Sequence, residues 1–459
     1  MSWLKKLFAA VDMTEGRPWE KILIFTFPML LGNIAQQLYN TVDSVVVGKY
    51  VGDNALAAVG SASPILNLLL VLFIGISVGA GIMVSQYFGA KRREELSVTI
   101  GNCITLTAIA SVFIMIVGTL LARPLLELLN TPESIIEWCA SYLQILFIGI
   151  AGMAYYNILC GVLRGLGDSI SALLYLVVAS ILNIVLDLLF VAKFNMEVAG
   201  VALATAIAQA ISAILCVIKL MRMTAFFDFS PKYFKLKKQI SLSVVRLGLP
   251  SGVTQAIMSM AMLLVQSLTN SFGEQLIAAN VIIMRVDGFA MLPNMSFGTA
   301  MTTYAGQNVG AGKYDRVSKG AKQGTIMAVG ISTMITVTIL MFGRYLMGIF
   351  TDTPELVSLS MNMMRILAVG YIAMAVTQSL SGVMRGAGDT VTPMWISIVQ
   401  TIVIRVPLAY SLVYLTKSEL YPDGRKECIF LSLVISWILG SILTSIFYAK
   451  GKWKKAALH

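Results

Sequence analysis

The nonapeptide GVLRGLGDS at residues 161–169 returns as GVMRGAGDT at residues 382–390, 221 positions further along a chain of 459 residues. Three other short segments repeat at nearly the same spacing. They are TFP at 26–28 with GLP at 248–250, FGAKRRE at 88–94 with VGAGKYD at 309–315, and TPE at 131–133 with TPE at 353–355. One common shift, constant to within a single position, aligns all four pairs. The chain therefore consists of two related halves.

The composition is that of a membrane protein. The chain is 57% hydrophobic and 12% charged, with a mean hydropathy of +0.82, whereas a soluble domain has about 25% charged residues. Uncharged runs such as 65–84 and 325–342 approach the ~20 residues that a spanning helix requires. They recur along the whole chain, so they are not a single signal peptide or anchor. They lack the alternation of barrel strands, which favours helices.

The apolar runs predict an all-α membrane protein with twelve transmembrane helices, six in each half. We place the spans near 22–44, 55–85, 97–121, 140–162, 170–192, 198–220, 246–270, 276–303, 321–345, 362–383, 391–416 and 428–449. Six is an even number, so the halves share one orientation and form parallel repeats. The predicted parts are an N-terminal lobe at 1–224, a basic cytoplasmic linker at 225–244 and a C-terminal lobe at 245–459.

The basic residues predict the orientation. With both termini in the cytoplasm, most of the 34 Lys and Arg residues fall in cytoplasmic loops, as the positive-inside rule requires. We therefore expect a multi-pass protein of the cell (inner) membrane with lipid as its surroundings. The net charge of +11 is explained by these loops, and we expect no nucleic-acid partner.

Several kinds of chemistry are excluded. The five cysteines show no metal-binding spacing, and the single histidine is His459 at the C-terminus. A phosphate-binding loop needs GxxxxGK[ST], but the pair Gly312-Lys313 is followed by Tyr314. We expect no cofactor and no enzymatic activity.

The nonapeptide itself predicts a tight cytoplasmic turn between two spans. Arg164 would meet the negative end of a helix dipole, Gly165 and Gly167 could take the left-handed conformation that ends a helix, and Asp168 followed by Ser169 could cap the next helix. The second copy repeats these roles with Arg385, Gly386, Gly388, Asp389 and Thr390.

Together these features resemble the multidrug and toxic compound extrusion (MATE) family. The resemblance rests on two sets of six spans, FPMLLGNIAQQLYNTVDSVVVGKYVG at 27–52, the two RG(L/A)GD turns and QNVGAGKYDR at 307–316. It covers nearly the whole chain. It implies a V-shaped pair of lobes with alternating access, and export of organic, often cationic, amphipathic compounds driven by inward Na⁺ or H⁺. We expect a monomer.

Polar residues inside the spans are candidates for function. Two stripes at helical spacing occur in the first half: Asn33, Gln36, Asn40 and Asp43 on span one, and Ser180, Asn183 and Asp187 on span five. If the stripes face each other, their oxygens suit Na⁺ and a buried carboxylate suits a proton. Capping or structural bridging is the alternative.

Only the first half of the chain carries these two acids. Applying the shift of the nonapeptide to Asp43 and Asp187 gives Leu264 and Leu408, so the second half lacks both acids. MATE proteins similarly use an acid on span one and an Asn/Asp pair on span five. The resemblance therefore assigns coupling-ion binding, with Na⁺ as a possible metal ion, to Asp43, Asn183 and Asp187, and we add Asn40 and Gln36.

The second half has its own charges in Arg285, Asp287 and Arg405. Asp287 could pair with Arg405 across helices, or these residues could serve substrate or proton binding. NorM-type members carry a glutamate on span seven, but the segment 251–270 here has no acid. The candidate substrate-cavity residues are Tyr39, Tyr156, Arg285, Asp287, Phe289, Met291 and Arg405.

The predicted function is a secondary antiporter that exports such compounds in exchange for H⁺ or Na⁺. The main alternative is a flippase for a lipid-linked saccharide, which would need more basic residues around its cavity than Arg285 and Arg405. A membrane-embedded enzyme would need histidine or a metal motif, and the two-lobe repeat does not favour a passive channel.

Overall fold

The computed structural model describes residues 10–129 and 131–456, apart from the side chains of residues 43–45, 53–54, 56–57, 64 and 68. Most of the described residues are helical, and none of them is in a strand. The first repeat comprises α2 (Pro18–Tyr50), α3 (Asp53–Gly89), α4 (Arg93–Leu128), α5 (Glu133–Ile148), α6 (Ile150–Gly165), α7 (Ser169–Asp187), the π-helix η1 (Leu188–Lys193) and α8 (Glu197–Arg222). A short 3₁₀ helix, η2 (Pro231–Phe234), follows.

The second repeat has a similar order of elements, but one helix stands where the first repeat has α5 and α6, and a further helix follows its π-helix. It comprises α9 (Lys238–Asn270), α10 (Glu274–Gly310), α11 (Tyr314–Gly348), α12 (Pro354–Gly386), α13 (Val391–Ile398), the π-helix η3 (Val399–Arg405), α14 (Val406–Leu415), α15 (Glu427–Ala449) and the 3₁₀ helix η4 (Lys452–Lys455). The helices α3 and α10 are each 37 residues long, and their first residues, Asp53 and Glu274, are related by the shift of the nonapeptide. The duplication read from the nonapeptide therefore extends to the bounds of the helices.

The predicted all-α membrane fold is confirmed. Eleven spans of the described residues are long and apolar enough to cross a membrane, and the bent pair of α5 and α6 makes a twelfth. The bend of 55° lies at Gly149, inside the predicted span 140–162. A Cβ at Gly149 would lie 2.6 Å from the Cβ of Ala206 on α8, so this glycine also permits close packing of α8. Its equivalent, Gly370, lies in the unbroken helix α12.

Contacts divide the chain into two units, and the first helix of each repeat passes from one unit to the other. The first unit holds Met1–Asp12, as far as these residues are described, and Phe27–Gly252; the second holds Met13–Thr26 and Val253–His459. The crossing points lie beside Pro28 in α2 and Pro250 in α9. Both prolines lie well inside a helix, where proline removes a backbone hydrogen bond.

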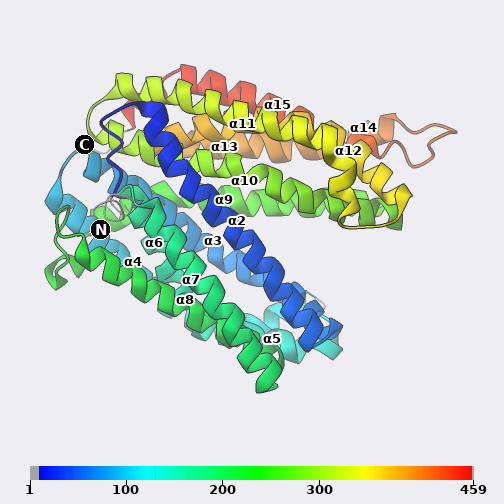
Figure 1. Cartoon of the computed structure of the whole chain (residues 1–459), viewed down its shortest axis with the longest axis horizontal. Helices are drawn as coiled ribbons and strands as arrows, with labels where there is room; N and C mark the ends of the chain where they lie inside the picture. Colours follow the sequence, from blue (N-terminus) through cyan, green and yellow to red (C-terminus); the bar gives the residue numbers. More distant parts are fainter. Residues whose placement is uncertain (1–9, 130, 457–459) are drawn as a thin grey trace. The chain divides into compact units, whose positions relative to one another are not determined.

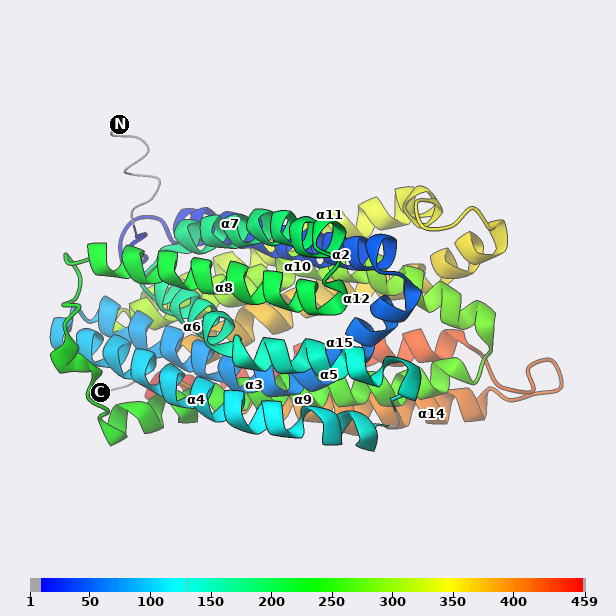
Figure 2. The same cartoon turned by 90° about the horizontal axis from the view of Figure 1, so that it is seen from below.

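In the first unit, α3 packs against α4, α5 and α6, and Figure 2 shows these helices together. The contact between α3 and α6 depends on glycine. A Cβ at Gly161 would lie 2.6 Å from the carbonyl oxygen of Ser77, and one at Gly165 would lie 2.7 Å from that of Gly81. Gly161 and Gly165 form a GxxxG pair, which allows two membrane helices to approach closely.

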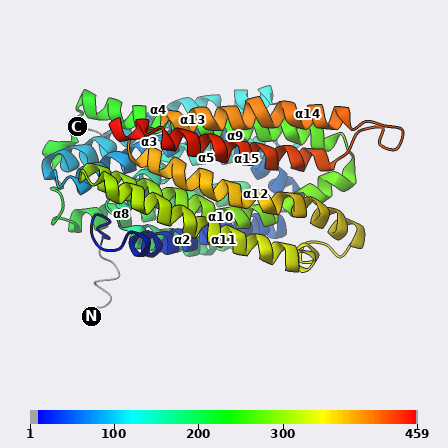
Figure 3. The same cartoon turned by 90° about the horizontal axis from the view of Figure 1, so that it is seen from above.

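In the second unit, α12 packs against α10, α11 and α15 (Figure 3). The same glycine pair recurs at Gly382 and Gly386, where a Cβ would collide with the carbonyl oxygens of Gly298 and Thr302 on α10. The GVxRG part of the nonapeptide is therefore a helix-packing motif in both units.

The remainder of the nonapeptide forms the predicted turn, with one correction. Gly167 and Gly388 have positive φ angles of 87° and 102°, which L-residues rarely adopt. Asp168 caps α7 by accepting from Ser171 N at 2.9 Å, and Lys219 Nζ lies 3.1 Å from its carboxylate. Gly165 is not left-handed, because it lies inside α6 and is required for packing. Arg164 and Arg385 are in the last turns of α6 and α12, as predicted.

The basic segment between the repeats is docked on α4. Asn102 accepts from Lys237 N at 2.6 Å and donates to Lys235 O at 3.2 Å, and Thr105 Oγ1 donates to Phe234 O at 2.7 Å. A Cβ at Gly101 would collide with the Tyr233 carbonyl. This segment is therefore an ordered part of the first unit.

Candidate functional site

The Asn183–Asp187 stripe of α7 lies against α8, its neighbour in Figure 1. Asn183 is 1% exposed and Asp187 is fully buried. A buried carboxylate charge is costly unless hydrogen bonds or a cation compensate it. Asn183, which is itself held by Thr205 on α8, donates one compensating hydrogen bond.

The Asn183 amide connects Asp187 to Thr205 through hydrogen bonds at both of its polar atoms. With its nitrogen toward α7, Nδ2 donates to Asp187 Oδ2 at 2.8 Å, while its oxygen accepts from Thr205 N at 3.0 Å and Thr205 Oγ1 at 3.2 Å. A rotated amide would instead bring its nitrogen to Thr205 Oγ1, at 3.2 Å. Its oxygen would then face Asp187 Oδ2, and two facing oxygens need a proton or a cation between them.

Sequence reasoning missed Thr205 and its neighbours on α8. Thr205, Gln209 and Ser212 follow one another at helical spacing on one face, and Ser212 Oγ donates to Tyr175 O on α7 at 2.9 Å. Within the described residues, the buried Gln209 Oε1 has no hydrogen-bond partner. The spacing rule that selected the α7 stripe would also have selected these three.

The helix α2, which carries the other predicted polar stripe, is a neighbour of α7. The Cβ position of Gly32 lies 3.6 Å from Leu173 and 3.9 Å from Leu176, so α2 and α7 are in contact at this level. Further along α2, Gln36 Nε2 donates to Asn40 Oδ1 at 3.4 Å, which places both on one face.

Asp43 lies in α2, and its side chain is outside the described residues. Among the residues that are described, no cluster of three His, Cys, Asp or Glu side chains could hold a metal ion. Whether Asp43 faces Asp187 therefore stays a prediction.

A π-helical segment follows the site. The helix α7 ends at Asp187 and continues as η1, and η3 in the second unit ends at Arg405. Short π segments within helices often mark functional positions. The sequence carries no signal for them, because the hydrophobic pattern continues through both.

The charges of the second unit meet around a tyrosine. Tyr371 on α12 donates its hydroxyl to Asp287 Oδ1 at 2.9 Å. Arg405 is near enough to interact electrostatically with Asp287, but no ion pair joins the two among the described residues. Arg405 Nε has no hydrogen-bond partner there, and Arg285 is exposed.

The aromatic and methionine candidates for the substrate cavity do not share one environment. Tyr156 is buried in the first unit, and Met291 is partly buried against the core of the second. Tyr39 is partly buried on α2, and Phe289 is 41% exposed on α10. In the described conformation, Tyr156 has little surface to offer a cargo molecule.

Two repeats of six apolar helices with a buried polar cluster in the spans define a class: polytopic transporters built by duplication. The chain matches the MatE family over residues 28–189 and again over 250–411. The starts of these two matches, at 28 and 250, agree with the shift read from the sequence. The chain belongs to the MATE family, and the resemblance seen in its motifs is confirmed.

Relatives and solved structures agree with this assignment. The chain is 30% identical to "Probable multidrug resistance protein YpnP" of Bacillus subtilis (strain 168), over 98% of this chain and 99% of that one. It is 29% identical to "Probable multidrug resistance protein YoeA" of the same organism, over 89% and 90%. A structure titled "Crystal structure of MATE in complex with MaL6" superposes with a TM-score of 0.90, at 24% identity over 97% of this chain and 99% of that one, and is similar in fold.

Proposed function

We propose that the protein is a secondary antiporter that exports organic, often cationic, amphipathic compounds in exchange for H⁺ or Na⁺. The multidrug resistance named in the relatives' descriptions supports the cargo class. The observation that carries the coupling is the buried group of Asn183, Asp187 and Thr205 in α7 and α8. The protein would act as a monomer in the plasma membrane with both termini in the cytoplasm.

Rotation of the Asn183 amide would supply a physical coupling element. Without an ion, the amide N–H groups compensate the Asp187 charge. When a proton or Na⁺ arrives, the amide rotates and presents its oxygen to the newly bound ion. In the rotated amide, the oxygen would lie 2.8 Å from Asp187 Oδ2. This distance fits a hydrogen bond from a protonated Asp187 carboxyl group. The Asn183 oxygen and the Asp187 carboxylate oxygen are also ligands that Na⁺ accepts.

Neighbouring groups would extend this site. Asp43 lies eleven residues after Gly32 on α2, and Asp187 lies eleven residues after Leu176 on α7. Spans one and five run in the same direction, and Gly32 contacts Leu176. This register supports Asp43 at the level of Asp187, with Asn40 and Gln36 below it. We keep all three in the proposed ion site and add Thr205.

Coupling requires that the ion and the cargo prefer different states of the protein. In the proposed cycle, the outward-facing state takes up the ion at Asp187, which neutralises a buried negative charge and rearranges the first unit. The cargo then leaves outward, and the inward-facing state releases the ion. The Tyr371–Asp287 pair and Arg405 are the candidates for contact with cargo in the second unit.

The test is dye efflux from proteoliposomes under an imposed Na⁺ gradient and, separately, under a pH gradient. We expect Asp187→Asn to abolish gradient-driven efflux, because a neutral amide neither accepts a proton nor offers a negative charge to Na⁺. The matched control is Asp352→Asn, which makes the same chemical change at an exposed position and should transport normally. The gradient that drives the wild-type protein identifies the ion.

Normal gradient-driven efflux by Asp187→Asn would contradict the coupling site. Absence of dye efflux from the wild-type protein under either gradient would contradict the antiporter. Translocation of a fluorescent lipid-linked saccharide would then favour the flippase alternative.

A further inference from the structure

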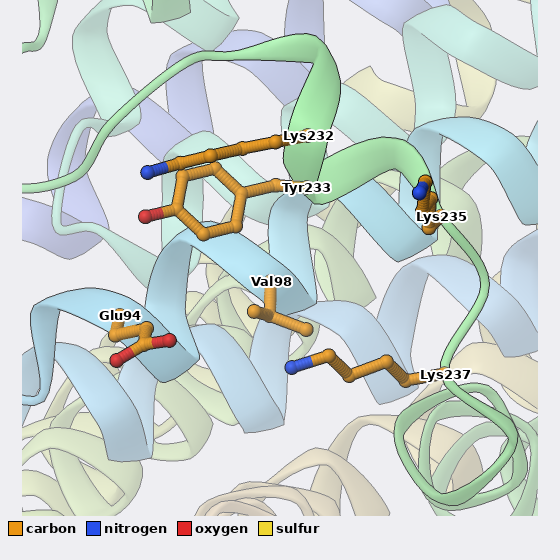
Figure 4. A pocket seen from close by; sticks show the side chains of 6 residues that line it. All are labelled: Glu94, Val98, Lys232, Tyr233, Lys235 and Lys237. Carbon is orange, nitrogen blue, oxygen red and sulfur yellow. The ribbon is translucent and has the colours of Figure 1, made fainter.

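A cavity of about 230 Å³ lies between the start of α4 and the segment that leads to α9 (Figure 4). Its lining consists of Glu94 and Val98 on α4 and of Lys232, Tyr233, Lys235 and Lys237 on the docked segment. The cavity belongs to the first unit. It lies at the end of the helical bundle opposite to Asp187, because α7 begins beside this end and Asp187 is its last residue.

The wall that carries the lysines is held in place by several contacts. Asn102 and Thr105 bind the backbone of residues 234–237, and the absence of a side chain at Gly101 admits the Tyr233 carbonyl. At the other end, Arg93 donates to the carbonyls of Thr224 and Ala225 and pairs with Asp228 at 2.7 Å. The lysines therefore project from an ordered frame, which reduces the entropy lost on binding.

The cavity has an excess of positive charge, with three lysines and one acidic residue in its lining. Glu94 is its one acidic lining residue. Lys232 Nζ lies over the Tyr233 ring at 4.6 Å from its centroid, and Figure 4 shows the two side chains extending side by side. Among the described residues, the ammonium groups of Lys235 and Lys237 have no ion pair or hydrogen bond. The nearby acid Asp228 is already paired with Arg93.

Apolar side chains surround this basic cavity. Leu236, between two of the lysines, is 45% exposed, Leu242 near the start of α9 is 61% exposed, and Phe226 is 38% exposed. Exposed leucine and phenylalanine beside lysines are typical of a segment at the membrane–water interface. The basic loops place this interface on the side predicted to be cytoplasmic.

We propose that this cavity is a binding site for a phosphate group with net negative charge, such as the headgroup of an anionic phospholipid. Three lysines around one cavity, next to a lipid-facing surface, match the basic pockets by which membrane proteins hold anionic headgroups. The tyrosine hydroxyl adds a hydrogen-bond donor to the phosphate oxygens. Inorganic phosphate shares this chemistry and is the other possible source.

The experiment uses the full-length protein in detergent. Short-chain phosphatidylglycerol and short-chain phosphatidylcholine are titrated separately, and native mass spectrometry counts the lipid molecules bound to each protein. Binding of inorganic phosphate is measured by calorimetry. The test variant is Lys232→Gln/Lys235→Gln/Lys237→Gln. The matched control is Lys450→Gln/Lys452→Gln/Lys454→Gln, which removes the same charge from the basic C-terminal segment.

We expect phosphatidylglycerol to bind the wild-type protein and the control equally, and the test variant at least about tenfold more weakly. Phosphatidylcholine should not distinguish the three proteins. Binding of inorganic phosphate that also depends on the three lysines would assign the site to free phosphate, whereas binding of phosphatidylglycerol alone would assign it to lipid. Equal binding of phosphatidylglycerol by the test variant and the wild-type protein would overturn the proposal, as would an equal loss in the control.

A second variant tests the proposal in case the triple variant does not fold. Glu94→Gln removes the one acidic lining residue and leaves every lysine in place, so it should bind phosphatidylglycerol more tightly than the wild-type protein. An unchanged or weaker affinity in a folded Glu94→Gln protein would count against the site.

Discussion

Thr205 can hold the Asn183 amide in the observed orientation and in the proposed rotated one. When the amide nitrogen faces Asp187, the backbone N–H and the hydroxyl of Thr205 both donate to the amide oxygen. When the amide oxygen faces Asp187, the Thr205 hydroxyl is the acceptor for the amide nitrogen. Loss of the hydroxyl therefore leaves the amide one Thr205 partner in the first orientation and none in the proposed ion-bound orientation.

The first prediction follows from this difference. Thr205→Val keeps the backbone N–H and the shape but removes the hydroxyl, so the ion-bound orientation leaves a buried N–H without an acceptor, at a cost of about 1–3 kcal/mol. The concentration of Na⁺ or H⁺ that gives half-maximal efflux should rise about tenfold. Thr205→Ser, which keeps the hydroxyl, should behave as the wild-type protein. Equal ion dependence of the two variants would be evidence against the rotating amide.

At the scale of residues, the sequence predicts which side chains share a face but not what they face. The spacing of Asn183 and Asp187 indicated one polar stripe, and both are buried. The spacing of Arg285, Asp287 and Arg405 could not identify Tyr371 as the partner of Asp287, because that partner lies far along the chain on another helix. Partners across helices depend on packing, which a single sequence does not encode in its periodicity.

At the scale of elements, packing between helices rests on glycines that occupy equivalent places in the two repeats. Gly386 on α12 faces the carbonyl oxygen of Thr302 on α10, and Gly165 on α6 faces that of Gly81 on α3. Both members of the first pair are related to those of the second by the shift of the nonapeptide. The duplication has thus preserved this contact between helices.

Gly386→Ala should therefore destabilise the protein. The new Cβ would collide with the Thr302 carbonyl and lie 2.9 Å from Gly306 N, so α10 and α12 must separate at a cost of about 1–3 kcal/mol. Thermal unfolding in detergent should show a lower Tm. Gly330→Ala on α11 is the matched control, because its Cβ would meet nothing within 4 Å and alanine favours a helix. Equal Tm values for the two variants would contradict the close approach.

The docked segment before α9 should loosen in acid. The hydrogen bond from Arg93 lowers the pKa of Asp228 below its usual value of 3.8. Docking is then fully stabilised above that value, and the stabilisation is lost as the pH falls through the lower pKa of the folded state. Hydrogen exchange of the amides at 225–228 should accelerate in the wild-type protein over this range, relative to Asp228→Asn, which has no carboxyl group to protonate. Identical pH profiles of the two proteins would refute this role of Asp228.

Hydropathy predicts the twelve spans but not whether a span is bent. Gly149 lies at a bend of 55°, whereas its equivalent Gly370 lies in a continuous helix. Gly370 packs against the ring of Trp437, whereas Gly149 meets the small residue Ala206. The neighbours of a glycine, rather than the glycine alone, determine the path of the helix.

At the scale of the whole molecule, each repeat begins its first helix in the unit formed by the other. The start of α9 is held by Asn102 on α4, which accepts from Lys237 N. The start of α2 is held by Gln323 on α11, which accepts from Trp19 N at 3.1 Å. Asn102 and Gln323 occupy equivalent positions in the two repeats, so the two helix starts are held in the same way. The short repeated motifs reveal the duplication, but they do not predict that the first helix of each repeat begins in the other unit.

The segment QNVGAGKYDR at 307–316 holds the residues that precede α2 in the second unit. Arg316 donates to the carbonyls of Met13, Glu15 and Gly16 at 2.6–3.2 Å, and Lys313 Nζ donates to Thr14 O at 2.9 Å. Gln307 and Asn308 bind the backbone of Met13. The motif that supported the family resemblance is thus a clamp on the chain that leads into α2.

Arg316→Gln should release this clamp and with it the start of α2. The substitution removes charge-assisted hydrogen bonds to three carbonyls, each of which contributes about 1.5–3 kcal/mol at most, so the free energy of unfolding should fall by about 2–3 kcal/mol. Trypsin should cut faster after Arg17, and the Tm in detergent should drop. Lys319→Gln removes an exposed charge one turn further along α11 and should change neither measurement. If Arg316→Gln resists trypsin at Arg17 as well as this control does, residues 13–16 are held by Gln307, Asn308 and Lys313 without Arg316. The exchange of first helices would then not depend on the arginine.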